Sequence, residues 1–287
     1  MIDRKINYPK FIEGSRAWLK RYIQDNHLKS IVIGISGGID STVSCALAAP
    51  VCRELDIPLI GRPLMSITNE TEELDIAELV GQAFCDDFKF SGINRIYTKI
   101  VEDIQEAEEI ELTPLQKGNI KARYRAIYLR NLASIHKGAV LDNDNFTEWN
   151  LGFWTIGGDS PMDINLGLHY LWKTEVYQLA YELAREAETK DESEAIMASI
   201  KLQPTDGNGV SKTDCDQFGL KKYEEVDEVL YRRYYNPIPN VYSHLVASYG
   251  REGVDKVIAL HEKTAYKRLP SPQIPTETEL SISKETD

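Results

Sequence analysis

Apolar residues follow two different spacings along the chain, and together they predict alternating strands and helices. Three continuous apolar runs, at Ile31 to Ile35, Ile57 to Leu64 and Gly138 to Leu141, are typical of strands buried on both faces of a parallel sheet. Helical spacing predicts helices over residues 10–24, 42–55, 70–84, 115–136, 171–187, 223–233, 242–249 and 254–266, and residues 93–104 give a weaker strand-to-helix signal. This alternation predicts the α/β fold class, with right-handed crossovers and a doubly wound parallel sheet flanked by helices.

Segments without a clear period separate these elements. Residues 143–163 are rich in Gly and Asp, and residues 206–209 are again glycine-rich. Long irregular segments in a compact domain are usually functional, so we expect loops near 83–92 and 205–217 to cover a site. We predict a single domain over residues 1–270 and a loosely ordered polar tail at 271–287.

Composition narrows the class of protein. The 287 residues have a mean hydropathy of -0.36, with no apolar run near the roughly 20 residues of a membrane helix and no apolar signal-peptide core. We therefore expect a cytoplasmic protein without membrane contact. With 33 Lys and Arg against 45 Asp and Glu, the net charge of -12 disfavours nucleic acid as a partner. The four cysteines form no CxxC pair, which disfavours a structural zinc site.

The sequence SGGIDS, Ser36 to Ser41, lies between the first predicted strand and a helix. Backbone N–H groups and the positive end of a helix dipole face an anion at such a position, and glycines allow a close approach. The hydroxyls of Ser36 and Ser41 add donors, whereas Asp40 among phosphates makes electrostatic sense if it holds Mg²⁺. The string is neither a Walker A loop nor GxGxxG. The alternative for a bare glycine pair is a tight connection without a ligand.

The full SGGIDS string resembles the pyrophosphate loop of the N-type ATP pyrophosphatases, whose fold is called adenine-nucleotide alpha-hydrolase-like. From about residue 10 to residue 270, later segments are similar in order to those of the ammonia-dependent NAD synthetases. The resemblance implies that Asp40 and Glu148 are metal ligands for Mg²⁺ and that Asp40 and Lys173 are the catalytic residues. It implies that ATP, the co-substrate, binds to Gly34, Ile35, Ser36, Gly37, Gly38, Ile39, Asp40, Ser41, Arg62, Asn143, Lys173 and Thr205.

The resemblance also implies a site for the acceptor, deamido-NAD. This site is implied by KGNIKAR at 117–123, by Gly158-Asp159 followed by Asp163, and by a C-terminal pair at 266–267. The 140–155 segment resembles the GT(N/D)xxE pattern and supplies Glu148 and Asn143 to the metal and ATP. The implied deamido-NAD-binding residues are Arg123, Asp163, Tyr266 and Lys267. The chain departs from the family pattern at three places. Ile156 replaces a lysine and Tyr266 a histidine, which concern the acceptor, and Asp142-Asn143 replaces Gly-Thr in the segment implied to bind ATP.

The implied reaction has two steps. The carboxylate of deamido-NAD attacks the α-phosphorus of MgATP, and ammonia then displaces AMP from the acyl adenylate. We expect ammonia as the direct nitrogen donor because about 30 residues precede the first strand, too few for a glutaminase domain. The resemblance further implies a homodimer. Two alternatives stay open: an adenylating ligase of the same superfamily with another acceptor, and a catalytically inactive nucleotide-binding regulator.

Overall fold

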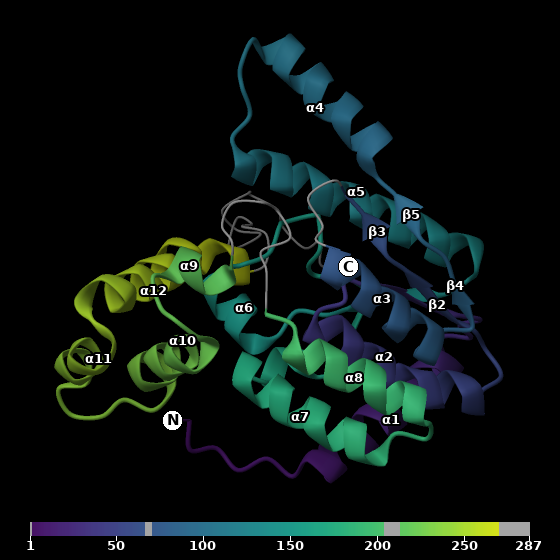
Figure 1. Ribbon diagram of the computed structural model, residues 1–287, viewed down its shortest axis with the longest axis horizontal. Helices are drawn as coiled ribbons and strands as arrows, with labels where there is room; N and C mark the ends of the chain where they lie inside the picture. The colour runs from purple at the N-terminus through teal and green to yellow at the C-terminus, as the bar shows by residue number, and fades with distance from the viewer. Residues whose placement is uncertain (1, 67–70, 204–212, 270–287) are drawn as a thin grey trace, which may run out of the picture.

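A five-stranded parallel sheet lies at the centre of the protein, whose computed structural model describes residues 2–66, 71–203 and 213–269 (Figure 1). The strands pair in the order β4-β2-β1-β6-β7. Their bounds are β1 (Ile31–Gly34), β2 (Leu59–Arg62), β4 (Asp87–Phe88), β6 (Ala139–Asp142) and β7 (Ile164–Asn165). Ile31 pairs with Leu59 on one side and with Ala139 on the other. A smaller parallel pair, β3 (Leu64–Met65) and β5 (Ser91–Gly92), continues beyond β2.

The direction of winding reverses between β1 and β6. From β1 the chain proceeds to β2 and β4 on one side, whereas β6 is followed by β7 on the other side. The loops after β1 and β6 therefore diverge at the carboxyl edge of the sheet and leave a crevice between them, which is where ligands bind in doubly wound folds. The predicted fold class is confirmed.

Helices cover both faces of the sheet. One face carries α1 (Tyr8–Asp25), α2 (Ile39–Glu54), α3 (Thr71–Phe84), α7 (Lys173–Glu186) and α8 (Lys190–Lys201), and the other carries α5 (Pro114–Ile135), on which α4 (Asn94–Glu108) packs. Ile31 and Ile33 are buried against the first group, while Val32 is buried against α5. This burial on both sides explains the continuous apolar run in β1.

A second core joins the remaining helices. The elements are α6 (Phe146–Leu151), α9 (Asp214–Phe218), α10 (Tyr223–Leu230), α11 (Val241–Tyr249) and α12 (Arg251–Lys263), with a π-helical turn at Tyr231–Tyr235 and 3₁₀ turns at Leu168–Tyr170 and Ala265–Arg268. Trp172, Phe218 and Leu230 are buried in this core. In Figure 1 these helices gather beside the sheet, and α6 lies between them and the sheet. This group therefore borders the crevice.

All eight predicted helices are present, and the differences are local. Helix α2 begins at Ile39, three residues before the predicted start at 42, because Gly38 is its N-cap and the hydroxyls of Ser41 and Thr42 donate to the Gly38 carbonyl. The 93–104 segment is wholly helical within α4. Helix α8 was not predicted, although Thr189 and Glu192 form a capping box at its start.

The prediction of a covering loop at 83–92 is wrong. These residues end α3 and then form β4 and β5, whose backbones pair with β2 and β3. Each strand has two residues, so no apolar period marks it in the sequence. In the other expected cover, residues 213–217 belong to the start of α9, while 204–212 lie outside the described residues, as do the glycine-rich 206–209 and the 271–287 tail.

Candidate active site

A cavity of about 340 Å³ lies in the crevice at the carboxyl edge of the sheet. Both diverging loops line it, together with the start of α2, α6 and α7. The lining includes most residues that the sequence assigned to ATP and the metal: Gly34, Ile35, Ser36, Gly38, Ile39, Asp40, Ser41, Arg62, Asn143, Glu148 and Lys173. Gly37 is not in the lining, and Thr205 lies outside the described residues.

The loop after β1 has the geometry of an anion site. Gly37 has a φ of +85°, and a Cβ there would collide with the carbonyl oxygen of Glu73, so only glycine fits. The hydroxyls of Ser36 and Ser41 lie 3.1 Å apart, and Ser36 Oγ accepts from the Gly38 N–H at 3.2 Å. Because a helix leaves its first-turn N–H groups without intrahelical partners, the start of α2 presents donors to the cavity.

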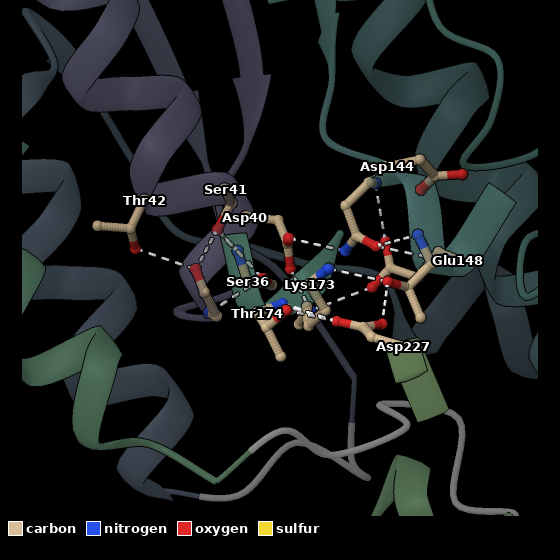
Figure 2. Close-up of polar contacts among 12 residues, drawn as sticks. Ser36, Asp40, Ser41, Thr42, Asp144, Glu148, Lys173, Thr174 and Asp227 are labelled. Atoms are coloured by element: carbon tan, nitrogen blue, oxygen red, sulfur yellow. Dashed lines mark hydrogen bonds and ion pairs between the residues drawn. The ribbon is translucent and has the colours of Figure 1, made fainter. Parts of the chain in front are cut away.

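Lys173 brings the two predicted metal ligands together (Figure 2). Its Nζ donates to Asp40 Oδ2 at 2.5 Å and to Glu148 Oε1 at 3.1 Å. The lysine side chain is 4% exposed, and each carboxylate is 15% exposed. The three charged groups come from the first turns of α7, α2 and α6. Two carboxylates thus share one cation at the wall of the cavity.

Asn145 fixes this arrangement. Its amide nitrogen donates to Asp40 Oδ1 at 2.9 Å, and its Oδ1 accepts from the backbone N–H groups of Thr147 and Glu148. The Asn145 N–H in turn donates to Glu148 Oε2, which completes a capping box at the start of α6. Asn143 also lines the cavity, and its Oδ1 is buried with no hydrogen-bond partner among the described residues. That oxygen is available to a ligand.

Asp227 is a buried carboxylate behind Lys173 that the sequence analysis missed. It accepts hydrogen bonds from Thr147 and Thr174, and burial raises its pKa to about 7. It lies on α10, far from the motifs in sequence. Its spacing of four and three residues from the apolar Tyr223 and Leu230 of the predicted 223–233 helix was a signal, but nothing local indicated its partners.

Arg125 is a second missed residue. It lines the cavity, its Nε donates to the Leu64 carbonyl at 3.3 Å, and burial lowers its pKa. It lies on the stripe of α5 that holds Ala122 and Leu129, at spacings of three and four residues. Arg123, the arginine chosen from the sequence, does not fall on that stripe. Helical spacing could therefore have favoured Arg125 for the cavity.

Acidic groups adjoin the cavity near β6. Burial, together with the charges of Asp142, Glu148 and Asp159, raises the pKa of Asp144 well above its usual value. Among the described residues, Asp142, Asp144 and His169 are the group whose ligand atoms lie close enough to hold a metal, within 4.8 Å of one another. Arg62, in contrast, is tied to the sheet, since it donates to the Asp87 carboxylate at 2.8 Å and to two carbonyls.

The four residues predicted to bind deamido-NAD lie outside the lining of this cavity. Arg123 is exposed and donates from Nε to the Ile156 carbonyl at 3.2 Å. Lys267 donates to the Gly152 carbonyl at 2.6 Å and also to the Trp154 carbonyl. Asp163 pairs with Arg130, and Tyr266 is exposed. Arg123 and Lys267 therefore both contact the 152–156 segment, and the role of all four stays a prediction.

Comparisons with known proteins identify the family of the chain. The family model for NAD synthase matches residues 11–271. A relative from Thermoplasma volcanium, named NH(3)-dependent NAD(+) synthetase, is 30% identical over 267 residues, which are 91% of this chain and 96% of the relative. The described helices include none that is long and apolar enough to cross a membrane.

Solved structures agree with the fold. The NMN synthetase from Francisella tularensis has a TM-score of 0.76 at 22% identity and covers 95% of this chain and 100% of its own. The NH3-dependent NAD synthetase from Campylobacter jejuni has a TM-score of 0.68 at 21% identity. The match covers 94% of this chain and 100% of that one. These likenesses show the fold, an α/β arrangement with a parallel central sheet and flanking helices. With its family match over most of its length, the chain belongs to the NAD synthase family.

Proposed function

We propose that the protein is an AMP-forming ligase that makes NAD from deamido-NAD, MgATP and ammonia. The observation that carries this proposal is the convergence of the SGGIDS loop, the Asp40 and Glu148 carboxylates and the Lys173 ammonium on one cavity. The name of the Thermoplasma relative, most of whose length this chain covers, supports the choice of ammonia and NAD.

The loop would bind the phosphates of ATP. The first-turn N–H groups of α2 and the hydroxyls of Ser36 and Ser41 supply donors, and the orphaned Asn143 Oδ1 supplies an acceptor for a hydroxyl or amino group of the nucleotide. Lys173 would leave its carboxylate partners for the phosphates and offset the negative charge that develops as pyrophosphate departs.

The paired carboxylates fit a magnesium site. Asp40 and Glu148 present oxygen ligands, which Mg²⁺ prefers, and in the structure they already share one cation, the Lys173 ammonium. Magnesium bound by these residues would neutralise phosphate charge. The neighbouring Asp144 adds a third carboxylate at the wall of the cavity.

The reaction needs no protein nucleophile. The acceptor carboxylate oxygen bonds to the α-phosphorus as pyrophosphate leaves with the electron pair of the broken P–O bond. Ammonia then attacks the carboxyl carbon, AMP leaves with its oxygen, and the new amide loses a proton. The protein contributes orientation and electrostatic stabilisation, which suits a site built from a loop, a lysine and carboxylates.

We further propose a homodimer with deamido-NAD bound near its interface. Large apolar side chains are exposed along α5 at Leu115, Ile127 and Ile135. A second copy packed along this helix would cover such side chains. Arg123, on the same helix, would then lie close to the partner. The free, buried Cys45 and Cys52 suit a reducing compartment, which supports a cytoplasmic location.

A ligase of the same type with another acceptor is the second candidate. Ile156 and Tyr266 are both exposed, and as an isoleucine and a tyrosine they lack the charge that a lysine and a protonated histidine would supply there. A smaller or less charged acceptor would need fewer of these contacts.

One assay separates the candidates. Purified protein is incubated with MgATP, ammonium chloride and either deamido-NAD or nicotinate mononucleotide, and NAD, NMN, AMP and pyrophosphate are measured. Equal amounts of NAD, AMP and pyrophosphate with deamido-NAD are expected. Turnover of the mononucleotide alone would favour the second candidate, and ATP binding without products from either would favour the inactive regulator.

A further inference from the structure

We propose that Asp227 is a positioning residue for the ligase reaction: through Thr147 and Thr174 it holds the start of α7 so that Lys173 faces Asp40 and Glu148. The inference rests on the proposed function, in which Lys173 stabilises the leaving pyrophosphate. It assigns a role to helix α10, which contributes no residue to the lining of the cavity.

A single carboxylate joins α6 and α7 (Figure 2). Asp227 is fully buried, and its Oδ1 accepts from Thr147 Oγ1 at 2.5 Å. Its Oδ2 accepts from the backbone N–H of Thr174 at 3.0 Å and from Thr174 Oγ1 at 2.8 Å. Thr147 Oγ1 in turn accepts from the backbone N–H of Lys173 at 2.8 Å. All three of these bonds to Asp227 come from donors, as an ionised carboxylate requires.

This network caps α7 from a distant element. The N-cap residue is Trp172, whose indole is only a donor and cannot accept a bond from the first turn. Thr147 and Asp227 instead accept from the N–H groups of Lys173 and Thr174. The negative charge also lies at the positive end of the helix dipole.

Helix α10 supports the lysine at two points, because Asp227 holds its backbone through Thr147 and Tyr223 lies beside its ammonium group. Tyr223 lies four residues before Asp227, and therefore on the same face of the helix. The Lys173 Nζ lies 5.2 Å from the centre of the Tyr223 ring, a cation–π distance. The backbone of the lysine is thus fixed through Asp227, and its ammonium through Tyr223, Asp40 and Glu148.

The position of the network favours a role in the reaction over a purely structural one. A serine at the N-cap could satisfy first-turn N–H groups from within α7, without burying a carboxylate from another helix. The buried alternative fixes the side chain of Thr147, which precedes Glu148, and through it the backbone N–H of Lys173. The residues it orders are therefore those that hold the charged groups of the site.

The test uses Asp227→Asn and Thr147→Val in the full-length protein. Competitive acetylation of Lys173, followed by mass spectrometry, measures how well its ammonium is held and needs no turnover. We expect Lys173 to be acetylated faster in both variants. We also expect kcat to fall about tenfold or more with a smaller change in the KM for ATP, because misplacement by about 1 Å can lower a rate on the order of 100-fold.

A double-mutant cycle separates positioning from general damage. If Asp227 acts through Lys173, then Asp227→Asn lowers kcat little further in a Lys173→Met background. The matched control is Glu192→Gln, another buried carboxylate at the start of a helix, which accepts from the backbone N–H groups of Glu188 and Thr189 just before α8. It should lower the melting temperature and leave kcat and Lys173 acetylation unchanged.

The outcomes are distinguishable. Unchanged acetylation and kcat in folded Asp227→Asn and Thr147→Val would overturn the inference and leave the proposed function intact. Full additivity with Lys173→Met would overturn it as well. Faster acetylation in a protein that makes no NAD would support the positioning of Lys173 by Asp227 and reject the proposed function.

Discussion

Lys173 and Asp40 are in direct contact across the crevice, with Nζ and Oδ2 separated by 2.5 Å. The lysine begins α7 and the aspartate lies in the first turn of α2, and both side chains line the cavity. The proposed roles give the lysine to the leaving pyrophosphate and the aspartate to magnesium. Substrate binding must therefore exchange this ion pair for two new ones, in which each partner keeps an opposite charge.

Loss of the Asp40 charge should abolish most activity. Asp40→Asn removes a proposed magnesium ligand and one partner of the nearly buried Lys173. We expect kcat to fall on the order of 100-fold or more, since a removed electrostatic contact has such an effect. Steady-state kinetics check the rate, and circular dichroism checks the fold. Glu148→Gln should behave alike and be less than additive with Asp40→Asn, whereas near-normal turnover of Asp40→Asn would contradict the metal assignment.

Lys173 should matter more for the rate than for ATP binding. Lys173→Met keeps the aliphatic stem within the Tyr223 and Asp40 surroundings and removes the charge. Because the charge is needed most as pyrophosphate leaves, we expect kcat to fall more than the KM for ATP rises. The same comparison with Lys173→Ala shows how much of the effect is packing. A change in KM alone would make Lys173 a ground-state binder.

The stability of the fold should depend on pH through Asp227. Burial is the main cause of its pKa of about 7, and the Glu175 charge raises that pKa further, while bonds from Thr147 and Thr174 lower it. A carboxyl whose pKa is raised on folding contributes stability that is present below the unfolded pKa, about 4, and is lost as the pH rises through about 7. The free energy of unfolding should therefore fall over this range.

Comparison with Asp227→Asn isolates this effect, because other buried carboxyl groups, such as Glu175, titrate in both proteins. Urea unfolding at about pH 5 and about pH 8 should show the wild type losing stability relative to the variant at the higher pH. An equal difference at both values would show that Asp227 does not titrate in this window.

Local patterns predicted the part of the site that follows from neighbouring residues. The apolar run of β1, the SGGIDS string and the lysine at the start of a helix each contain their own signal, and the cavity gathers them as expected. Asp227 could not be placed in this way, because it bonds Thr174 from 53 positions away in the sequence. Two-residue strands such as β4 depend on pairing with β2 and leave no period of their own.

Two features that were not predicted, helix α8 and Arg125, did have a local signal in the sequence. The capping box of Thr189 and Glu192 marks the start of α8, so that helix was accessible to the sequence analysis. Arg125 was separable from Arg123 by its place on the buried stripe of α5. By contrast, the position of Lys267 against the Trp154 carbonyl depends on packing between α6 and α12, which no local spacing encodes.

Ile156 should weaken the binding of deamido-NAD, and a lysine at this position should restore it. Ile156 is half exposed, so a longer polar side chain at this position has room. Its carbonyl accepts from Arg123, so that side chain would also lie beside a residue proposed to bind deamido-NAD. We expect Ile156→Lys to lower the KM for deamido-NAD by roughly tenfold or more, because a charge-assisted hydrogen bond contributes roughly 1.5 to 3 kcal/mol. Leu79→Lys, at an exposed apolar position on α3, adds the same charge elsewhere and should leave that KM unchanged. An equal effect of both variants would indicate general attraction of a negatively charged substrate to a less acidic protein. An unchanged KM in Ile156→Lys, with faster turnover of nicotinate mononucleotide than of deamido-NAD, would instead assign the site to the other acceptor.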